Sequence, residues 1–274
     1  MTFRLCLLGN SHISAYKRAL SEWEGQRRDI EISMFGAAGA KFADLTVRQD
    51  AIVAKSDAAA SSLLMTGGRD RIPFEDYDAL VVIGGGTRIS EFGSILKQYR
   101  PPFANSALRP DKGDESSPRL DTFYHKKRPE PVSALLFDEM MTAAAGSSNA
   151  ASLLARVARR GGLRLGHVAA PFPSSAVLDA KPRLVVSRIA RLGLGRDFAD
   201  CIWRALQASL PDNTTLIRPP DDVLLHSVLT DKIYSDGSTP LMDERGEHGD
   251  DDCIHMNAAY GEIMLQRVIE AICK

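Results

Sequence analysis

The sequence predicts an α/β fold in which a mainly parallel, five-stranded sheet is covered by helices on both faces. Apolar runs of strand length alternate along the chain with stretches whose apolar residues recur at helical spacing, and such alternation favours parallel pairing. Three of these runs end directly in glycine-containing turns, which suit tight connections from a strand to a helix. The predicted strands are residues 3–8, 30–35, 79–83, 163–170 and 214–218.

The first predicted strand and the helix after it form a single N-terminal unit. The strand ends at Gly9, and an apolar stripe at helical spacing begins at Ile13. Ser11 therefore lies at a helix N-terminus, where free backbone N–H groups and the helix dipole favour negative charge. A nucleophile would suit this position. A helix cap is the alternative interpretation of Asn10 and Ser11, because both residue types are common caps.

The later elements follow from the same patterns. Residues 79–83 are continuously apolar, as expected for a central strand covered on both faces. Helices are predicted for residues 132–145, 149–160 and 197–210, and for a final segment with Asn257 as its N-cap. A short helix is predicted across residues 45–52. Residues 55–78 lack a clear period, apart from a short edge strand at 63–65.

One polar stretch interrupts this alternation. The segment from about residue 100 to 131 contains prolines and charged runs, which predict an insertion over the surface. No shift in composition marks a linker, so residues 1–274 are predicted to form a single domain.

Composition narrows the classes of function. The chain has 34 basic and 35 acidic side chains, so its overall charge attracts neither nucleic acid nor an anionic membrane. No apolar run approaches the about 18 residues of a membrane span, and the N-terminus has no signal-peptide pattern, so we expect a cytoplasmic protein. The four cysteines form no CxxC pair, which predicts reduced thiols. No feature bears on oligomeric state.

The common phosphate-binding motifs do not fit the spacing. A dinucleotide fingerprint starting at Gly84 would need a small residue at position 89, which is isoleucine. The chain also lacks the pattern GxxxxGK[ST]. No cofactor is predicted.

A second chemical signal precedes the final helix. Asp252 and His255 are separated by two residues, and a carboxylate on such a turn can hold one imidazole nitrogen while the other acts as a base. A solvated acidic loop at residues 250–252, beside a histidine that caps the helix, is the alternative. Because functional groups gather at the carboxyl ends of parallel strands, the glycine turns after Gly9, Gly36 and Gly84 should meet on one edge.

These blocks, in this order, resemble those of the SGNH or GDSL-type hydrolases. The blocks are Gly9-Asn10-Ser11-His12, Gly36-Ala37-Ala38-Gly39, Ile83-Gly84-Gly85-Gly86 and Asp252-x-x-His255. The resemblance implies a flavodoxin-like, three-layer α/β/α sandwich. It also implies Ser11 as nucleophile, His255 as base and Asp252 as the group that orients the base. The backbone N–H groups of Ser11 and Gly39 would bind the oxyanion. Members typically cleave acyl esters, including O-acetyl groups on sugars.

Two positions depart from the family pattern. Asn10 replaces the usual aspartate, and its amide can still stabilise the turn. Gly86 stands where the family has an asparagine that supplies a third oxyanion donor. Losing one such donor typically costs about 10²–10³ in turnover. Thr87 and Arg88 are the nearest candidate substitutes.

The resulting hypothesis is a serine hydrolase that cleaves or transfers an acyl group on a small or carbohydrate-linked ester. The alternative is a catalytically silent binding or assembly protein of the same fold, motivated by Gly86. His12 either lines the pocket beside Ser11 with Asn10 or only covers the first helical turn. A metal site of His248, Cys253 and His255 lacks the usual ligand spacing, so no metal is predicted.

Overall fold

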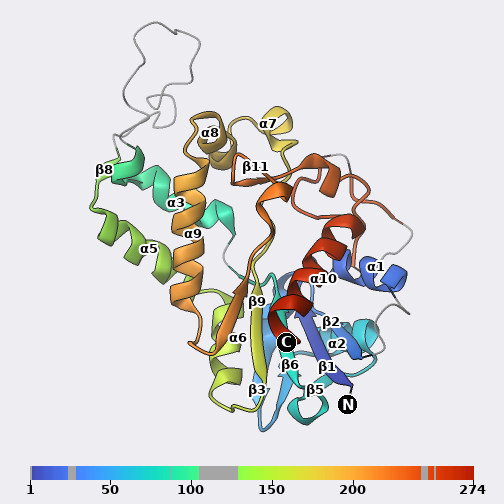
Figure 1. Cartoon of the computed structure of the whole chain (residues 1–274). Helices are drawn as coiled ribbons and strands as arrows, with labels where there is room; N and C mark the ends of the chain where they lie inside the picture. The colour runs from blue at the N-terminus through green and yellow to red at the C-terminus, as the bar shows by residue number, and fades with distance from the viewer. Residues whose placement is uncertain (1, 24–28, 87, 105–128, 242–245, 250) are drawn as a thin grey trace, which may run out of the picture.

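The computed structural model describes residues 2–23, 29–86, 88–104, 129–241, 246–249 and 251–274. Its central sheet has five strands in the order β10-β9-β6-β1-β2, all parallel to their neighbours (Figure 1). The strands are β1 (Phe3–Gly9), β2 (Ile30–Gly36), β6 (Ala79–Ile83), β9 (Arg164–Val168) and β10 (Thr214–Ile217). The predicted α/β class and the five predicted strands are therefore confirmed.

Alternate side chains of β1 face opposite layers of helices. Leu5 and Leu7 pack with α1 and α10, whereas Cys6 and Leu8 pack with α2 and α6. These helices are α1 (Ile13–Trp23), α10 (Ala258–Ile272), α2 (Asp57–Gly67) and α6 (Asn149–Ala158). All four strand residues are fully buried, which explains why the run is apolar throughout. Gly261 lets α10 approach α1 closely, since a Cβ there would lie 2.1 Å from the carbonyl oxygen of Ala15.

A third group of helices lies beside the β10 end of the sheet (Figure 1). The group consists of α3 (Ile89–Gln98), α5 (Ala134–Gly146), α7 (Val177–Ala180), α8 (Val185–Arg191) and α9 (Gly195–Ser209). Their buried residues form one apolar cluster that includes Phe92, Phe137 and Phe198. The predicted helices at 132–145, 149–160 and 197–210 are present with ends shifted by one or two residues, while α3, α7 and α8 were not predicted.

The predicted helix across residues 45–52 is wrong. A 3₁₀ helix η1 (Gly39–Asp44) is followed by strands β3 (Leu45–Arg48) and β4 (Ala51–Ala54), which form a small antiparallel sheet with β5 (Arg71–Pro73). Val47 pairs with Ile52 across the two strands. Branched side chains at such positions favour strand over helix, and Gln49 makes the tight turn with a positive φ of 51°.

The predicted edge strand at residues 63–65 is also wrong, because this segment lies inside α2. Ser56 caps that helix by accepting from the Ala59 N–H at 3.3 Å, and Gly68 ends it in the left-handed conformation with φ 75°. Leu63 is fully buried, but Leu64 and Met65 are 54% and 67% exposed. One buried residue in three fits the face of a surface helix.

The shorter elements complete the chain. They are η2 (Phe74–Asp76), β7 (Tyr99–Arg100), β8 (Glu130–Pro131), η4 (Asp221–Val223), β11 (Leu224–Leu225), β12 (Leu229–Thr230) and η5 (Lys232–Tyr234). Most of the predicted insertion, residues 105–128, lies outside the described residues; β7 and β8 pair on either side of it. No helix in the described ranges has the length and apolar character needed to cross a bilayer.

His167 on β9 makes the stability of the fold depend on pH. Its side chain is 1% exposed, and its Nδ1–H donates to the carbonyl oxygen of Val82 at 3.0 Å. Burial lowers the pKa of His167 from 6.5 to about 4. The unfolded chain therefore binds more protons than the folded chain between these values, so stability must fall as the pH falls through this window. The free energy of unfolding lost across this window is about 3 kcal/mol.

We expect the His167→Asn variant to lose less stability than the wild type between pH 6.5 and about 4, the window set by the pKa shift of His167. Asparagine keeps an N–H donor near the position of Nδ1 but cannot gain a proton. Urea unfolding at a series of pH values measures the difference. His226→Asn is the matched control, because His226 is exposed and its left-handed backbone tolerates asparagine. Equal pH dependence in the wild type and His167→Asn would contradict the assignment.

Candidate active site

The three glycine-bearing turns meet at one edge of the central sheet, as predicted. Gly9 is aligned with Gly36 of β2 and with Ile83 of β6 at the carboxyl ends of the strands. The Ala37 N–H donates to the Gly9 carbonyl at 2.9 Å, and the Asn10 N–H donates to the Ile83 carbonyl at 3.3 Å. These bonds fix the turns that carry Ser11, Gly39 and Gly86 next to one another.

Asn10 shapes the turn that presents Ser11. Its side-chain oxygen accepts from the His12 N–H at 3.2 Å, closing a local turn before α1 begins. A Cβ on Gly84 would lie 2.3 Å from that oxygen, so a glycine there makes room for the Asn10 amide. Within the described residues, the Ser11 hydroxyl bonds to His255 and not to a backbone N–H of the helix. Asn10 therefore stabilises the turn, and the Ser11 hydroxyl is not needed as a helix cap and can contact His255.

Ser11, His255 and Asp252 form a continuous hydrogen-bonded chain. The Ser11 hydroxyl lies 3.0 Å from His255 Nε2, and His255 Nδ1 lies 2.7 Å from Asp252 Oδ2. An ionised carboxylate can only accept, so Nδ1 carries the ring proton and Nε2 is free to accept from Ser11. The side chains of Asp252 and His255 are 17% and 13% exposed, which leaves the site partly open to solvent.

Asp252 remains ionised over the range in which proteins are normally active. Burial alone would raise the pKa of Asp252, but the hydrogen bond from the His255 ring and those from two backbone N–H groups outweigh it and lower the pKa to about 2. The backbone donors are Ile254 at 2.8 Å and His255 at 3.0 Å, both to Oδ1. Oδ1 is thus held by the turn itself, and Oδ2 is directed at the imidazole.

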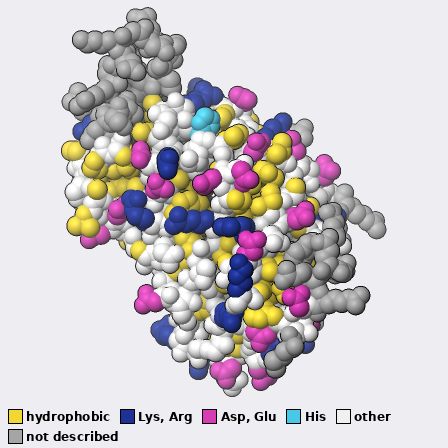
Figure 2. Space-filling model, viewed as in Figure 1, with side chains coloured by type: hydrophobic (Ala, Val, Ile, Leu, Met, Phe, Trp, Pro, Cys, Tyr) yellow, Lys and Arg dark blue, Asp and Glu magenta, His cyan; other side chains and the backbone are white. Residues whose placement is uncertain are grey.

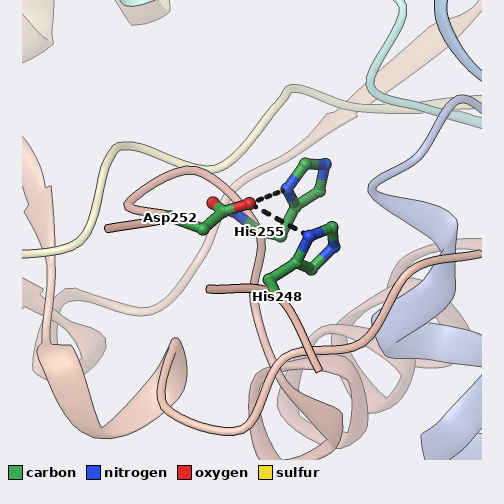
Figure 3. A group of neighbouring side chains, drawn as sticks. All are labelled: His248, Asp252 and His255. Carbon is green, nitrogen blue, oxygen red and sulfur yellow. Dashed lines mark hydrogen bonds and ion pairs between the residues drawn. The ribbon is translucent and has the colours of Figure 1, made fainter. Parts of the chain in front are cut away.

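His248 also belongs to this site, although the sequence did not indicate that it contacts Asp252. Its Nδ1 lies 3.2 Å from the same Asp252 Oδ2 that binds His255 (Figure 3). The two imidazole rings stack in parallel, with centroids 4.1 Å apart and an interplanar angle of 5°. Burial and the charge of His255 lower the pKa of His248, although Asp252 opposes them. A neutral His248 can donate from Nδ1 and support the plane of His255.

These residues also offer the ligand atoms of a metal site. Among the described residues, His248, Asp252 and His255 form one group whose nitrogen and carboxylate atoms lie within 4.8 Å of one another. The nitrogen-to-oxygen distances of 2.7 and 3.2 Å are those of hydrogen bonds, and both nitrogens point at the oxygen itself. A zinc ion about 2.0–2.2 Å from each ligand would have to displace those protons and separate the side chains. Cys253 is not in the group; its thiol lies against the Asp251 carbonyl.

Two backbone N–H groups are available to bind a negative oxygen. The N–H groups of Ser11 and Gly39 donate no hydrogen bond within the described part of the chain. Gly39 has a φ of +61°, and a Cβ there would meet nothing within 4 Å, so this turn is open on that side. Unpaired N–H groups at the carboxyl edge of the sheet suit an oxyanion.

The third predicted donor is absent at Gly86. A Cβ on Gly86 would lie 3.3 Å from Nε2 of the buried His167 ring. Because the other ring nitrogen donates to Val82 and the ring is neutral, Nε2 is an acceptor and cannot replace the missing donor. Arg88 occupies the N-cap position of α3 with an exposed side chain that makes no capping bond. Thr87 lies outside the described residues.

His12 lies beside the ring of His255. Its ring centroid is 5.5 Å from that of His255, and the planes are tilted by 38°. Its Nδ1 is buried and has no hydrogen-bond partner among the described residues. Burial lowers the pKa of His12 to about 3, helped by the charges of His255 and Arg88. His12 is therefore neutral beside Ser11 and His255, and its Nδ1, unpaired within the described residues, is shielded from solvent.

The site thus combines a serine, a histidine and an aspartate in the connectivity that serine hydrolases use, at the carboxyl edge of a parallel sheet. No family model, curated protein or solved structure matches this chain.

Proposed function

We propose that this protein is a serine hydrolase of the SGNH type, which cleaves or transfers an acyl group on a small or carbohydrate-linked ester. The observation that carries the proposal is the 3.0 Å contact between the Ser11 hydroxyl and His255 Nε2. Asp252 accepts a hydrogen bond from His255 Nδ1, so the ring proton is on Nδ1 and Nε2 has a free lone pair. Nε2 can therefore accept the proton of the Ser11 hydroxyl.

In the first half of the reaction, Ser11 Oγ attacks the ester carbonyl carbon while its proton moves to His255 Nε2. The carbonyl oxygen becomes an anion, which the N–H groups of Ser11 and Gly39 bind. The positive imidazolium is stabilised by the Asp252 carboxylate. When the tetrahedral adduct collapses, the bond to the leaving alcohol breaks, and the alcohol oxygen takes the proton from Nε2.

In the second half, water or a sugar hydroxyl attacks the acyl-serine. His255 Nε2 takes the proton of the attacking O–H, and the same two N–H groups bind the second oxyanion. Collapse breaks the bond between the acyl carbon and Ser11 Oγ, which recovers its proton from His255. Water yields the free acid, and a hydroxyl acceptor yields a new ester.

The proposal is tested with the purified full chain and two reagents. We expect p-nitrophenyl acetate to be hydrolysed and a fluorophosphonate probe to attach to Ser11, as located by peptide mass spectrometry. A folded protein that the probe does not label would sink the assignment of the nucleophile. Adding a sugar alcohol to the acetate assay separates transfer from hydrolysis, because transfer makes a sugar acetate.

A second candidate function follows from Gly86. Without a third donor, the same fold would serve as a catalytically silent binding or assembly protein. This candidate is favoured if a binding or cellular function persists in both Ser11→Ala and His255→Ala. It is excluded if either substitution abolishes that function in a protein that stays folded.

His248 provides a prediction about how the base is positioned. We expect His248→Phe, which keeps the stacked ring but loses the hydrogen bond to Asp252, to lower kcat about tenfold. KM should not change, because His248 binds the carboxylate and not the reacting atoms. His226→Asn, at an exposed histidine outside the site, should behave as the wild type. An unchanged kcat in His248→Phe would show that His255 is positioned without His248.

A further inference from the structure

A cavity separate from the candidate active site lies between α9 and the segment after β10. Its volume is about 350 Å³, within the range of small-molecule sites. One wall is a single face of α9 that carries Arg196, Asp200 and Trp203, and the other wall includes Arg218 and Asp221. In the view of Figure 2, Lys and Arg side chains form a row across the middle of the face, over α9 and β10. No member of the Ser11 site lines this cavity.

The charged groups of the cavity form no salt bridges within the described residues. Arg196, Arg218, Asp200 and Asp221 make no ion pair with any other described residue. Both guanidinium groups can therefore bind a ligand without first breaking an internal salt bridge. Both carboxylates can likewise accept hydrogen bonds from a ligand.

Arg218 is held in place by an aromatic ring. Its guanidinium carbon lies 5.4 Å from the centre of the Trp203 ring, a cation–π distance. Trp203 is only 7% exposed and packs against Phe172 with ring centroids 5.2 Å apart. An arginine fixed in this way loses less side-chain freedom when it binds a ligand.

A strained turn at His226 and Ser227 also lines the cavity and is packed against the start of α9. His226 and Ser227 have positive φ values of 51° and 61°, and Ser227 lines the cavity. A Cβ on Gly195 would lie 1.8 Å from the carbonyl oxygen of His226, so only glycine allows this approach. Non-glycine residues in this conformation persist where the surroundings impose it, and ligand sites are a common place for it. The cavity wall therefore has a defined shape.

We propose that this cavity binds an acidic sugar, a mono- or disaccharide with one carboxylate or phosphate group. Guanidinium groups bind such anions through paired N–H donors. Asp200 and Asp221 would accept hydrogen bonds from the sugar hydroxyls, and they would repel a bare inorganic anion. A ligand with one negative group and several hydroxyls satisfies both kinds of side chain. The proposal does not rest on the proposed hydrolase activity, because the two sites share no residue.

Calorimetric titration of the full chain tests the proposal with four probes: glucuronate, glucose phosphate, glucose and inorganic phosphate. We expect at least one acidic sugar to bind at least tenfold more tightly than glucose and than inorganic phosphate. The tighter of the two acidic sugars identifies the anionic group as carboxylate or phosphate. Failure of both acidic sugars to bind in the millimolar range, or equally tight binding of inorganic phosphate, would overturn the proposal.

Variants connect the binding to the cavity. Arg196→Gln should weaken the acidic sugar at least tenfold, and Arg183→Gln, at an exposed arginine outside the cavity, should leave it unchanged. Asp221→Asn should strengthen inorganic phosphate by a larger factor than the acidic sugar. It removes a repulsive charge for both ligands, but it also replaces one of the two carboxylate oxygens that can accept from the sugar hydroxyls. Urea unfolding checks that each variant is folded. Wild-type affinity in Arg196→Gln, or a gain for the acidic sugar in Asp221→Asn as large as the gain for inorganic phosphate, would contradict the proposal.

Discussion

Replacing Ser11 by alanine is expected to lower kcat for p-nitrophenyl acetate by about 10³-fold or more and to abolish labelling by the fluorophosphonate. Complete serine triads lose about 10⁶-fold when the nucleophile is removed. We expect a smaller loss here, because an oxyanion site that lacks one donor starts from a rate lower by about 10²–10³. The effect arises because Ser11 Oγ is the atom that faces His255 Nε2.

Ser21→Ala is the matched control for this variant. Ser21 lies near the end of α1, the helix that follows Ser11. Among the described residues, its exposed hydroxyl bonds only to the carbonyl of Arg18. It should keep wild-type turnover and labelling. If Ser11→Ala also kept its turnover, the hydrolysis would have to come from another group, and the nucleophile would be misassigned.

Asp252→Asn is expected to lower kcat by about 10²- to 10³-fold while the protein stays folded. The carboxylate accepts from the rings of His255 and His248, and its pKa of about 2 keeps it ionised at any working pH. An asparagine amide can donate to His255 Nδ1, which places the ring proton on Nε2 and removes the acceptor that Ser11 needs. Steady-state kinetics from pH 5 to pH 9, within the window in which Asp252 is charged, measures the loss.

Asp251→Asn supplies the comparison. Asp251 is the exposed neighbour of Asp252, and in the described residues its backbone carbonyl makes the local contacts, to Lys181 and Cys253. Removing its charge changes the local field but not the hydrogen bonds of the histidines. Equal losses in the two variants would mean that the charge of the loop, and not the position of Asp252, supports activity.

Local physics explains most of what the sequence could predict about the fold. Leu5 to Leu8 face two helical layers alternately, so every position is apolar and the strand is plain in the sequence. The prediction fails where short-range signals compete. The apolar residues 63–65 favoured a strand, but this segment is a helix that is capped by Ser56 and ended by Gly68. Of the three residues, only Leu63 is buried, as expected for one face of a helix. Strands β3 and β4 depend on their pairing with each other, which no local period reveals.

The same division applies to the candidate site. Asp252 and His255 are three residues apart on one turn, so their contact follows from the local sequence. His248 lies only four residues from Asp252, yet stacking on His255 depends on the path of the loop, for which the residue types give no signal. The acceptor nitrogen of His167 beneath Gly86 could not be predicted either, because β9 and β6 become neighbours only in the sheet.

By itself, the sequence determined the strand-to-helix alternation, the glycine turns and the pairing of Asp252 with His255. Each of these depends on residues close together in the chain, where spacing and side-chain type fix the geometry. Only the tertiary structure decided that Ser11 meets His255, which is 244 residues away, and that two arginines and two aspartates line one cavity. Parallel pairing brings the carboxyl ends of distant strands to one edge, and packing against those strands sets which loops meet there.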